Sequence, residues 1–180
     1  MSITLSVAPT AEPVSLPQAK AHLRITHSED DTEINAMITA AREVVEKYLN
    51  RDIAQRTWIY TAEGFSSPMV LPKAPVDSIT SIQYVDENGD TQTLSDSVYV
   101  LDDDKIHLKY DQTWPATRNQ RHAVTITFVS GYAETQGAVS HAILMIVASM
   151  YENRESQNYT QFAESAVAKL LLQTHRRFVL

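Results

Sequence analysis

The stretch HAILMIVASMYENRESQ, residues 141–157, constrains the fold more than any other, because it reads as a helix with apolar side chains on nearly every side. Ile143, Ile146, Val147, Met150 and Tyr151 recur at helical spacing and form one stripe. Further apolar residues lie outside that stripe, namely Leu144, Met145 and Ala148. The apolar run is about half of the roughly 20 residues that a membrane-spanning helix needs. The sequence therefore predicts a helix packed in protein, whose remaining apolar surface needs more cover than one small core provides.

The composition of the chain excludes several classes of protein. Its 180 residues suit one domain with a substantial core, or one core that bears an inserted lobe. The absence of cysteine excludes disulfides, thiol catalysis and cysteine-ligated zinc. A formal net charge of −7 argues against a protein that grips nucleic acid over a broad surface. The first residues, MSITLSVAPTAEPVSL, lack the basic and apolar regions of a signal peptide, so we expect a soluble, cytoplasmic protein.

Two helices are predicted near the N-terminus. Ser15 and Gln18 have the spacing of a capping box, which starts a helix over SLPQAKAHLRI, residues 15–25. A second helix, Asp31–Leu49, has apolar residues at every third or fourth position, and Ser28 or Asp30 can cap it. Residues 1–13 contain two prolines and small polar residues, and are expected to form a flexible arm that is ordered only where something holds it.

The apolar period then changes to two. Short runs rich in Thr, Val, Ile and aromatic residues predict an antiparallel β lobe. The runs are TWIYTA (57–62), SITSIQYV (78–85), VYVL (98–101), KIHLKY (105–110) and AVTITFV (123–129). Asn88-Gly89 predicts a hairpin whose two turn residues both have positive φ. A last helix is expected over TQFAESAVAKLLLQTHRR, residues 160–177.

This order of elements predicts an α+β fold with N-terminal helices, a central antiparallel β lobe with hairpins, and C-terminal helices. We expect a single domain over residues 1–180. Its parts are the arm (1–13), a helical part (14–52), the β lobe (55–130), a second helical part (138–175) and a tail (176–180).

Two acidic stretches are candidate cation sites. Asp86, Asn88 and Asp90 occupy alternate positions of a calcium-loop pattern, but Thr91 and Ser97 stand where that pattern needs glycine and glutamate. A hairpin turn is therefore favoured. The three aspartates at 102–104 are interpreted as a solvated turn between two strands.

No catalytic constellation is evident, and we expect neither an enzyme nor a cofactor. The histidines show no metal-binding spacing, and Ser140 beside His141 is interpreted as a helix cap. Two basic groups, TRNQRH (117–122) and HRRF (175–178), are interpreted as solvated surface. A site assembled from carboxylates that are distant in the sequence stays open as a third class of function.

A series of motifs follows one order along residues 13–155. They are PVSLPQAKAHLRI (13–25), INAMITAAREVVEKYLNRDI (34–53), LPKAPVDSITSIQYVDENGD (71–90), TWPA (113–116), VSGY (129–132) and AILMIVASMYENRE (142–155). In this order they resemble the head–tail connector (adaptor) proteins of long-tailed bacteriophages and prophages. The segment after residue 155 departs from the pattern of that family, because it contains no glycine or proline.

The resemblance implies a non-enzymatic subunit of a dodecameric ring that docks beneath the portal protein and extends the DNA channel. Its partners would be the portal, neighbouring subunits and a stopper or tail-completion protein, with no membrane contact. It would act at the head–tail junction of the virion, and in the host cytoplasm during assembly. Genome DNA would pass without specific binding, which suits the negative net charge. Neighbouring copies would then cover the apolar surface of the helix at 141–157.

The same resemblance suggests contact residues. Tyr151 and Arg154 are expected to contact a neighbouring subunit, although Arg154 can equally pair with a nearby glutamate. Arg176, Arg177 and Phe178 are expected to anchor the chain's end in the portal, with Phe178 folded back onto the last helix as the alternative. The alternative function is a monomeric virion or host interaction module without enzymatic activity.

Overall fold

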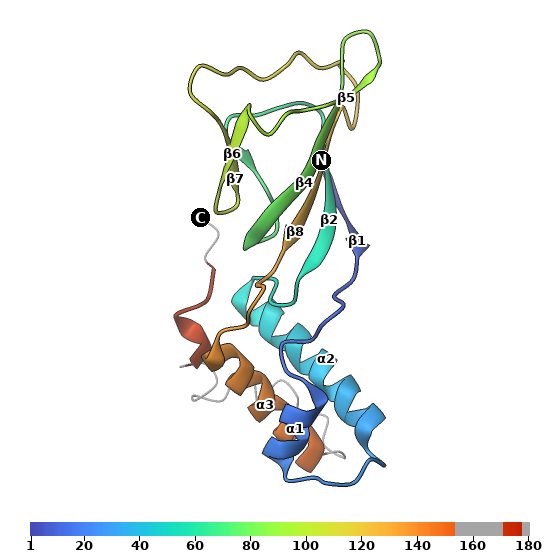
Figure 1. Ribbon diagram of the computed structural model, residues 1–180, viewed down its shortest axis with the longest axis vertical. Coiled ribbons are helices and arrows are strands. Elements are labelled where there is room, and N and C mark those ends of the chain that lie inside the picture. Colours follow the sequence, from blue (N-terminus) through green and yellow to red (C-terminus); the bar gives the residue numbers. More distant parts are fainter. Residues whose placement is uncertain (154–170, 178–180) are drawn as a thin grey trace. The chain divides into compact units, whose positions relative to one another are not determined.

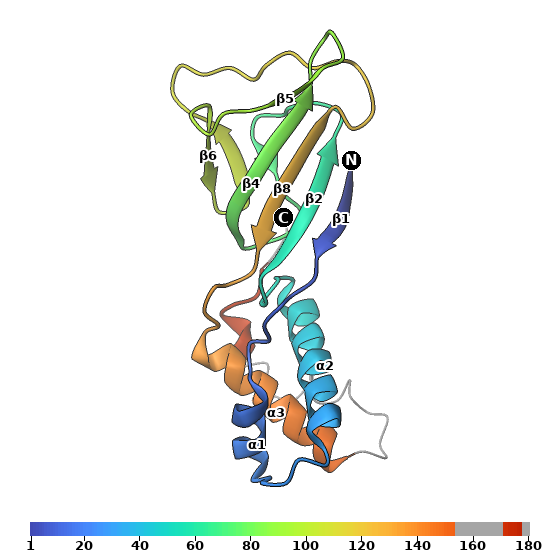
Figure 2. The same ribbon diagram turned by 45° about the vertical axis from the view of Figure 1, so that its right-hand side comes forward.

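The computed structural model describes residues 1–153 and 171–177, which form an α+β fold (Figures 1 and 2). The described residues divide into two compact units. The β unit comprises Met1–Thr10 and Gln55–Ala133, and the helical unit comprises Ala11–Ala54 and the described part of Glu134–Leu180. The elements are β1 (Ser2–Val7), α1 (Leu16–Leu23), α2 (Asp31–Leu49), β2 (Arg56–Ala62), β3 (Met69–Val70), β4 (Val76–Val85), β5 (Thr91–Thr93), β6 (Tyr99–Asp102), β7 (Lys105–Leu108), β8 (Val124–Ser130) and α3 (Gly137–Glu152).

The β unit consists of two antiparallel sheets that share one core. The larger sheet has the strand order β1-β2-β8-β4-β5 and the smaller one has the order β3-β7-β6. In the larger sheet Tyr60, Ile126 and Ile82 lie side by side on three adjacent strands and are buried. The smaller sheet adds Met69 and Ile106 to the same core. Alternation along each strand thus places one face of each sheet in the core, as the period-two pattern predicted.

The predicted strands are confirmed, and β1, β3 and β5 are additional. Residues 2–7, which were expected to belong to a flexible arm, form β1 at the edge of the larger sheet. The alternation of Ile3 and Leu5 with polar residues accounts for this, because these two side chains fall opposite Tyr60 and Trp58 of β2. The prolines of the arm come only after the strand has ended.

The hairpin at Asn88-Gly89 is confirmed, but its predicted turn type is wrong. Gly89 has a φ of 96°, whereas Asn88 is not among the residues with positive φ. The N–H of Gly89 donates to the carbonyl of Asp86, and the N–H of Asp86 donates to the carbonyl of Asp90. This pattern is that of a longer loop with glycine at its left-handed position. The Asp86 carboxylate favours it by accepting the N–H groups of Asn88 and Asp90 at 3.0 Å each.

The aspartates at 102–104 lie at the turn between β6 and β7, as interpreted from the sequence, but the turn is not solvated throughout, because Asp104 is only 6 % exposed. Asp102 pairs with Lys105 across the hairpin, and Asp103 adopts a left-handed φ of 53°. Aspartate tolerates that conformation better than most residues.

The helical unit packs α1, α2 and α3 around a core of their apolar stripes. Ser15 and Gln18 form the predicted capping box at the start of α1. The bounds of α2 agree with the prediction, and Ile34, Ile38, Ala41, Val45 and Leu49 on its stripe are buried. Its N-cap residue is Asp30, but the Asp30 side chain makes no capping hydrogen bond. No helix among the described residues is long and apolar enough to cross a bilayer.

The third helix starts earlier than expected. It begins at Gly137 after Gln136, so Ser140 lies within its first turn and is not the cap. Of the helix predicted over residues 160–177, residues 171–173 are helical and residues 160–170 lie outside the described part of the chain.

Candidate functional site

The apolar surface of α3 is divided between a buried stripe and a partly exposed remainder. Ile143, Ile146, Val147 and Met150 are buried in the helical core, as the spacing predicted. Leu144 is half-buried against that core. Met145 and Ala148 are also only half-buried in the described chain. The helix therefore presents apolar surface at its margins, and this surface is the first candidate for contact with another molecule.

Tyr151 lies at the end of α3, beside the start of α2. Its hydroxyl donates a hydrogen bond to the Asp30 carboxylate, and its ring packs against the helical core. This contact explains why Asp30 does not cap α2 with its side chain. Tyr151 thus has a role in joining α3 to α2, and it is half-buried. Arg154, predicted beside it, lies outside the described residues.

Arg176 and Arg177 lie at the opposite end of α2. The backbone N–H of Arg177 donates to the carbonyl of Leu49 at 2.9 Å, and the Arg176 guanidinium lies 5.4 Å from the centre of the Tyr48 ring. The cation–π geometry favours this position of Arg176. Phe178, the third residue of the predicted anchor, lies outside the described residues.

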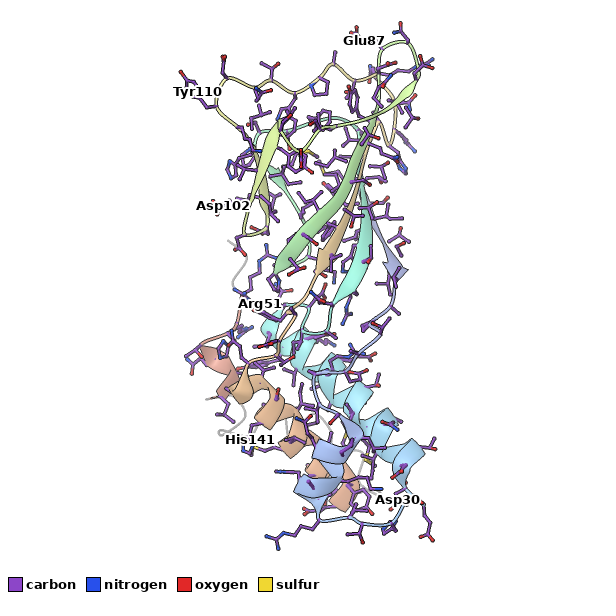
Figure 3. All side chains as sticks on the ribbon, in the orientation of Figure 1. Asp30, Arg51, Glu87, Asp102, Tyr110 and His141 are labelled. Atoms are coloured by element: carbon purple, nitrogen blue, oxygen red, sulfur yellow. The ribbon has the colours of Figure 1, made fainter. Side chains whose placement is uncertain are left out.

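The predicted contact residues therefore do not form one site. The whole of α2 lies between the two regions. Tyr151 binds Asp30 at the start of the helix, and Arg177 binds Leu49 at its end. Its 19 residues correspond to about 28 Å. In Figure 3, Asp30 and Arg51 mark the two ends of this helix. The helical unit thus carries two separate candidate contact regions and an apolar margin on α3.

A buried ionic cluster, which the sequence analysis missed, joins three segments of the helical unit. Arg42 on α2 donates from Nε to the Glu12 carboxylate and from Nη1 to the Glu46 carboxylate, at 2.8 Å each. Its side chain is only 5 % exposed. Glu46 Oε1 in turn accepts the backbone N–H groups of Ile53 and Ala54. We call Glu12, Arg42 and Glu46 the Arg42 cluster.

The Arg42 cluster holds two segments of the helical unit that lie next to its boundaries with the β unit. Glu12 follows the boundary after Thr10, and Ile53 and Ala54 precede the boundary before Gln55. Burial lowers the pKa of Arg42, but the hydrogen bonds and charges of Glu12 and Glu46 outweigh this effect, so the pKa is raised overall. The arginine therefore stays charged at any physiological pH. The i,i+4 spacing of Arg42 and Glu46 was the only signal of this cluster in the sequence.

The remaining ionisable side chains in the described part of the chain do not gather into a metal-binding cluster. Within residues 1–153 and 171–177, no group of three His, Asp or Glu side chains is arranged to hold a metal ion. Arg118, from the basic group at 117–122, covers the turn at Gly89, where an added Cβ would lie 2.5 Å from its Nη1. This arginine serves the local structure of the hairpin.

One protein family matches the chain, and several solved structures share its fold. The head completion protein family matches residues 14–169. No curated protein matches the chain. A chain in the neck of an empty gene transfer agent (GTA) particle, computed with C6 symmetry, is 19 % identical with a TM-score of 0.79, covering 100 % of this chain and 97 % of that chain. A chain from the virion of a native GTA particle is 18 % identical with a TM-score of 0.77 and the same coverage.

A third similar chain comes from the neck of a native GTA particle computed with C12 symmetry. It is 19 % identical with a TM-score of 0.72, again covering 100 % of this chain and 97 % of that chain. At such identities the likeness establishes a shared fold. It extends over both units of the present chain.

Proposed function

Because the chain belongs to the head completion protein family, a structural family without enzymatic activity, we propose that it is a subunit of a ring at the neck of a phage-like particle. The observation that carries this proposal is the family match over residues 14–169. The fold shared with neck proteins of GTA particles supports the location. The proposed site of action is the head–tail junction of the virion.

The finer proposal is that of an adaptor. The ring would dock beneath the portal protein, extend the DNA channel, and offer its far side to a stopper or tail-completion protein. A closed ring of heterologous contacts requires each subunit to present two different surfaces. The apolar margin of α3, with half-buried Leu144, Met145 and Ala148, is suited to one of them, because apolar residues are enriched in the buried centre of an interface.

The charge of the chain is compatible with a DNA channel. With a net charge of −7, each subunit avoids the many phosphate contacts that raise affinity for DNA and make it salt-dependent. The genome would therefore pass without being held.

The end of the chain, Arg176–Leu180, is proposed to dock into the portal. In support, Arg176 and Arg177 are fixed against Tyr48 and Leu49, so the three apolar residues that follow start from a defined point. Arginine and aromatic residues are enriched where binding energy concentrates. The alternative is that Phe178 packs back onto the helical unit.

Deleting residues 178–180 separates these alternatives, because it leaves the contacts of Arg176 and Arg177 in place. Docking predicts an unchanged melting temperature and lost co-sedimentation with portal rings. Back-packing predicts a lower melting temperature. Arg177→Ala, which keeps the backbone hydrogen bond and the apolar end, is the matched control. Full portal binding by the truncated protein would end the docking proposal.

The ring itself is tested by sedimentation. Analytical ultracentrifugation of the isolated protein should show mainly monomer or a concentration-dependent mixture, because a template removes much of the entropic cost of organising a ring. Addition of portal rings should shift the protein into a fast-sedimenting complex. A stable monomer or small dimer that never joins the portal would favour the alternative function, an interaction module without a ring.

A further inference from the structure

Strand β1 is weakly attached to the β unit. Among the described strands it pairs only with β2, at the edge of the larger sheet. Ile3 alone of its residues is half-buried, whereas Leu5 is 43 % exposed and Val7 is 49 % exposed. The ladder is also irregular between Leu5 and Val7. Loss of β1 would therefore uncover little apolar surface, and the four strands β2, β8, β4 and β5 would remain paired.

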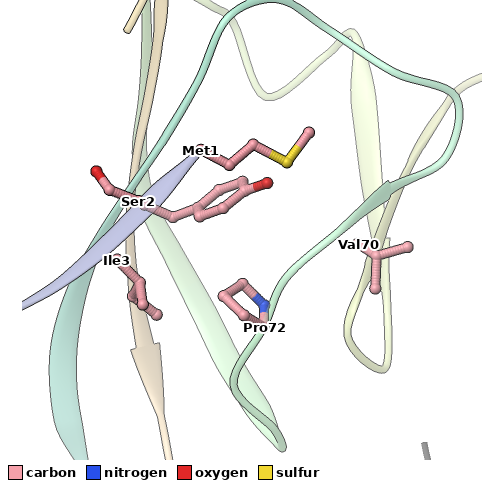
Figure 4. A pocket seen from close by; sticks show the side chains of 6 residues that line it. Met1, Ser2, Ile3, Val70 and Pro72 are labelled. Atoms are coloured by element: carbon pink, nitrogen blue, oxygen red, sulfur yellow. The ribbon is translucent and has the colours of Figure 1, made fainter.

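The packing under β1 is also incomplete. An open cavity of about 400 Å³ lies between the start of β1 and the segment that contains β3 (Figure 4). It is lined by Met1, Ser2, Ile3, Tyr60, Val70 and Pro72. Because this hollow is open to solvent, the side chains of Met1 and Ile3 that line it have fewer protein atoms around them than side chains in a closed core, and they gain less dispersion energy from packing.

The connection of β1 to the rest of the chain suits a separate arm. Residues 8–13 follow the strand without helix or strand structure and contain Pro9 and Pro13, which stiffen the backbone. Near the end of this linker, Glu12 is held by Arg42, at 2.8 Å, within the helical unit, so residues 8–11 are the part that lies between the strand and this contact. Release of β1 would therefore leave the helical unit anchored as before.

We propose that β1 is exchanged between copies of the chain, so that Ser2–Val7 of one copy adds to the β2 edge of its neighbour. The exchanged strand makes the same backbone and side-chain contacts that it makes in its own chain, so exchange costs little free energy. Each copy gives one strand and receives one, which links neighbours in a head-to-tail series. Exchange rests on the proposed function, because a ring brings neighbouring copies to the high effective concentration that exchange between chains requires.

Ser2 and Thr61 provide the test. Their hydroxyl oxygens lie 2.7 Å apart across the β1–β2 pair, and the chain has no cysteine of its own. A Ser2→Cys chain and a Thr61→Cys chain, carrying tags of different mass, are mixed, assembled on portal rings and mildly oxidised. Only an exchanged strand brings the two thiols together, since each chain has one. Thr93→Cys, on β5 at the other edge of the same sheet, replaces Thr61→Cys in the control.

Exchange predicts a disulfide-linked pair of Ser2→Cys with Thr61→Cys at several times the yield obtained with Thr93→Cys. Equal yields would overturn the proposal, and an excess with Thr93→Cys would instead indicate edge-to-edge contact of β1 with β5. Failure of the mixture to assemble on portals would contradict the proposed function. The exchange is then decided by the same comparison of yields in the concentrated free protein.

A second variant tests whether exchange matters for assembly. The double variant Ser2→Cys with Thr61→Cys, oxidised in dilute solution, locks β1 into its own chain. We expect it to keep its melting temperature or raise it, and to lose co-sedimentation with portals severalfold, whereas its reduced form should assemble normally. Undiminished assembly of the oxidised form would overturn the proposal.

Discussion

Replacement of Arg42 by methionine tests the role of the Arg42 cluster. Methionine keeps much of the side-chain volume but removes the guanidinium that binds Glu12 and Glu46 at 2.8 Å each. Glu46 is 10 % exposed, so its carboxylate would stay in a poorly solvated place without its arginine. Loss of one partner of a buried ion pair costs about 3–5 kcal/mol. We expect Arg42→Met to lower the free energy of unfolding by about 3 kcal/mol, the lower end of this range, because the N–H groups of Ile53 and Ala54 still donate to Glu46.

The double variant Arg42→Met with Glu46→Gln should recover much of this loss. The glutamine carbonyl can accept the same two N–H groups, and position 46 no longer carries a buried charge. The double variant should still lose about 1 kcal/mol of unfolding free energy relative to the original chain, because Glu12 loses its ion pair with Arg42. This loss is small because Glu12 is 31 % exposed and solvent partly screens the pair. Glu43→Gln is the matched control, because Glu43 is 67 % exposed and lies 3.7 Å from Arg42. Its effect should be at most about 0.5 kcal/mol.

The assay is urea-induced unfolding followed with two probes. Far-UV circular dichroism reports mainly on the helices. Tryptophan fluorescence reports on the β unit, because both tryptophans, Trp58 and Trp114, belong to it. The loss should therefore appear in the dichroism transition. The stabilising role of the Arg42 cluster would be contradicted if Arg42→Met lowered the free energy of unfolding by less than about 1 kcal/mol. It would also be contradicted if the double variant were no more stable than Arg42→Met alone.

Two other substitutions test the core and the hairpin. Ile38→Asp should prevent folding of the helical unit, because Ile38 is 1 % exposed and an unpaired buried carboxylate costs several kcal/mol; a soluble variant that melts cooperatively would show that the stripe is misassigned. The hydrogen bond from the Gln92 side chain, together with the backbone N–H of Asp90, lowers the pKa of Asp86. Asp86 therefore contributes stability above the pKa of an unfolded aspartate, and this contribution is lost as the pH falls through its lower folded value. An NMR titration of the Asp86 carboxyl should show a midpoint below that of an ordinary aspartate, and Gln92→Ala should raise it; a midpoint at or above the ordinary value would contradict the geometry.

Features set by local sequence were predicted well. The bounds of α2 agreed because its apolar period runs unbroken from Ile34 to Leu49 and the helix needs no distant partner to define it. The capping box of Ser15 and Gln18 was also found, since both residues belong to one turn. The Asn88-Gly89 turn was placed correctly, but its type depends on how the Asp86 side chain binds the backbone, which the dipeptide does not contain.

Features that depend on distant partners were missed. Strand β1 forms only because β2 offers it an edge, and the two strands are separated by the whole of α1 and α2. Glu12 meets Arg42 through the path of the linker, which no periodicity encodes. Tyr151 was expected to contact a neighbouring subunit and Arg177 the portal; these contacts stay predictions, and the sequence did not indicate that the two residues lie at opposite ends of α2.

Imaging of the protein with its portal tests directly whether the chain forms a ring at the neck. If the chain is a neck subunit, negative-stain electron microscopy of the mixture should show a second ring, coaxial with the portal ring and with the same rotational symmetry, because heterologous contacts close only when every position is filled. The ring should be absent when the protein is omitted. Portal rings that remain bare at saturating protein, with the protein present as separate particles, would contradict the assignment of this chain as a neck subunit.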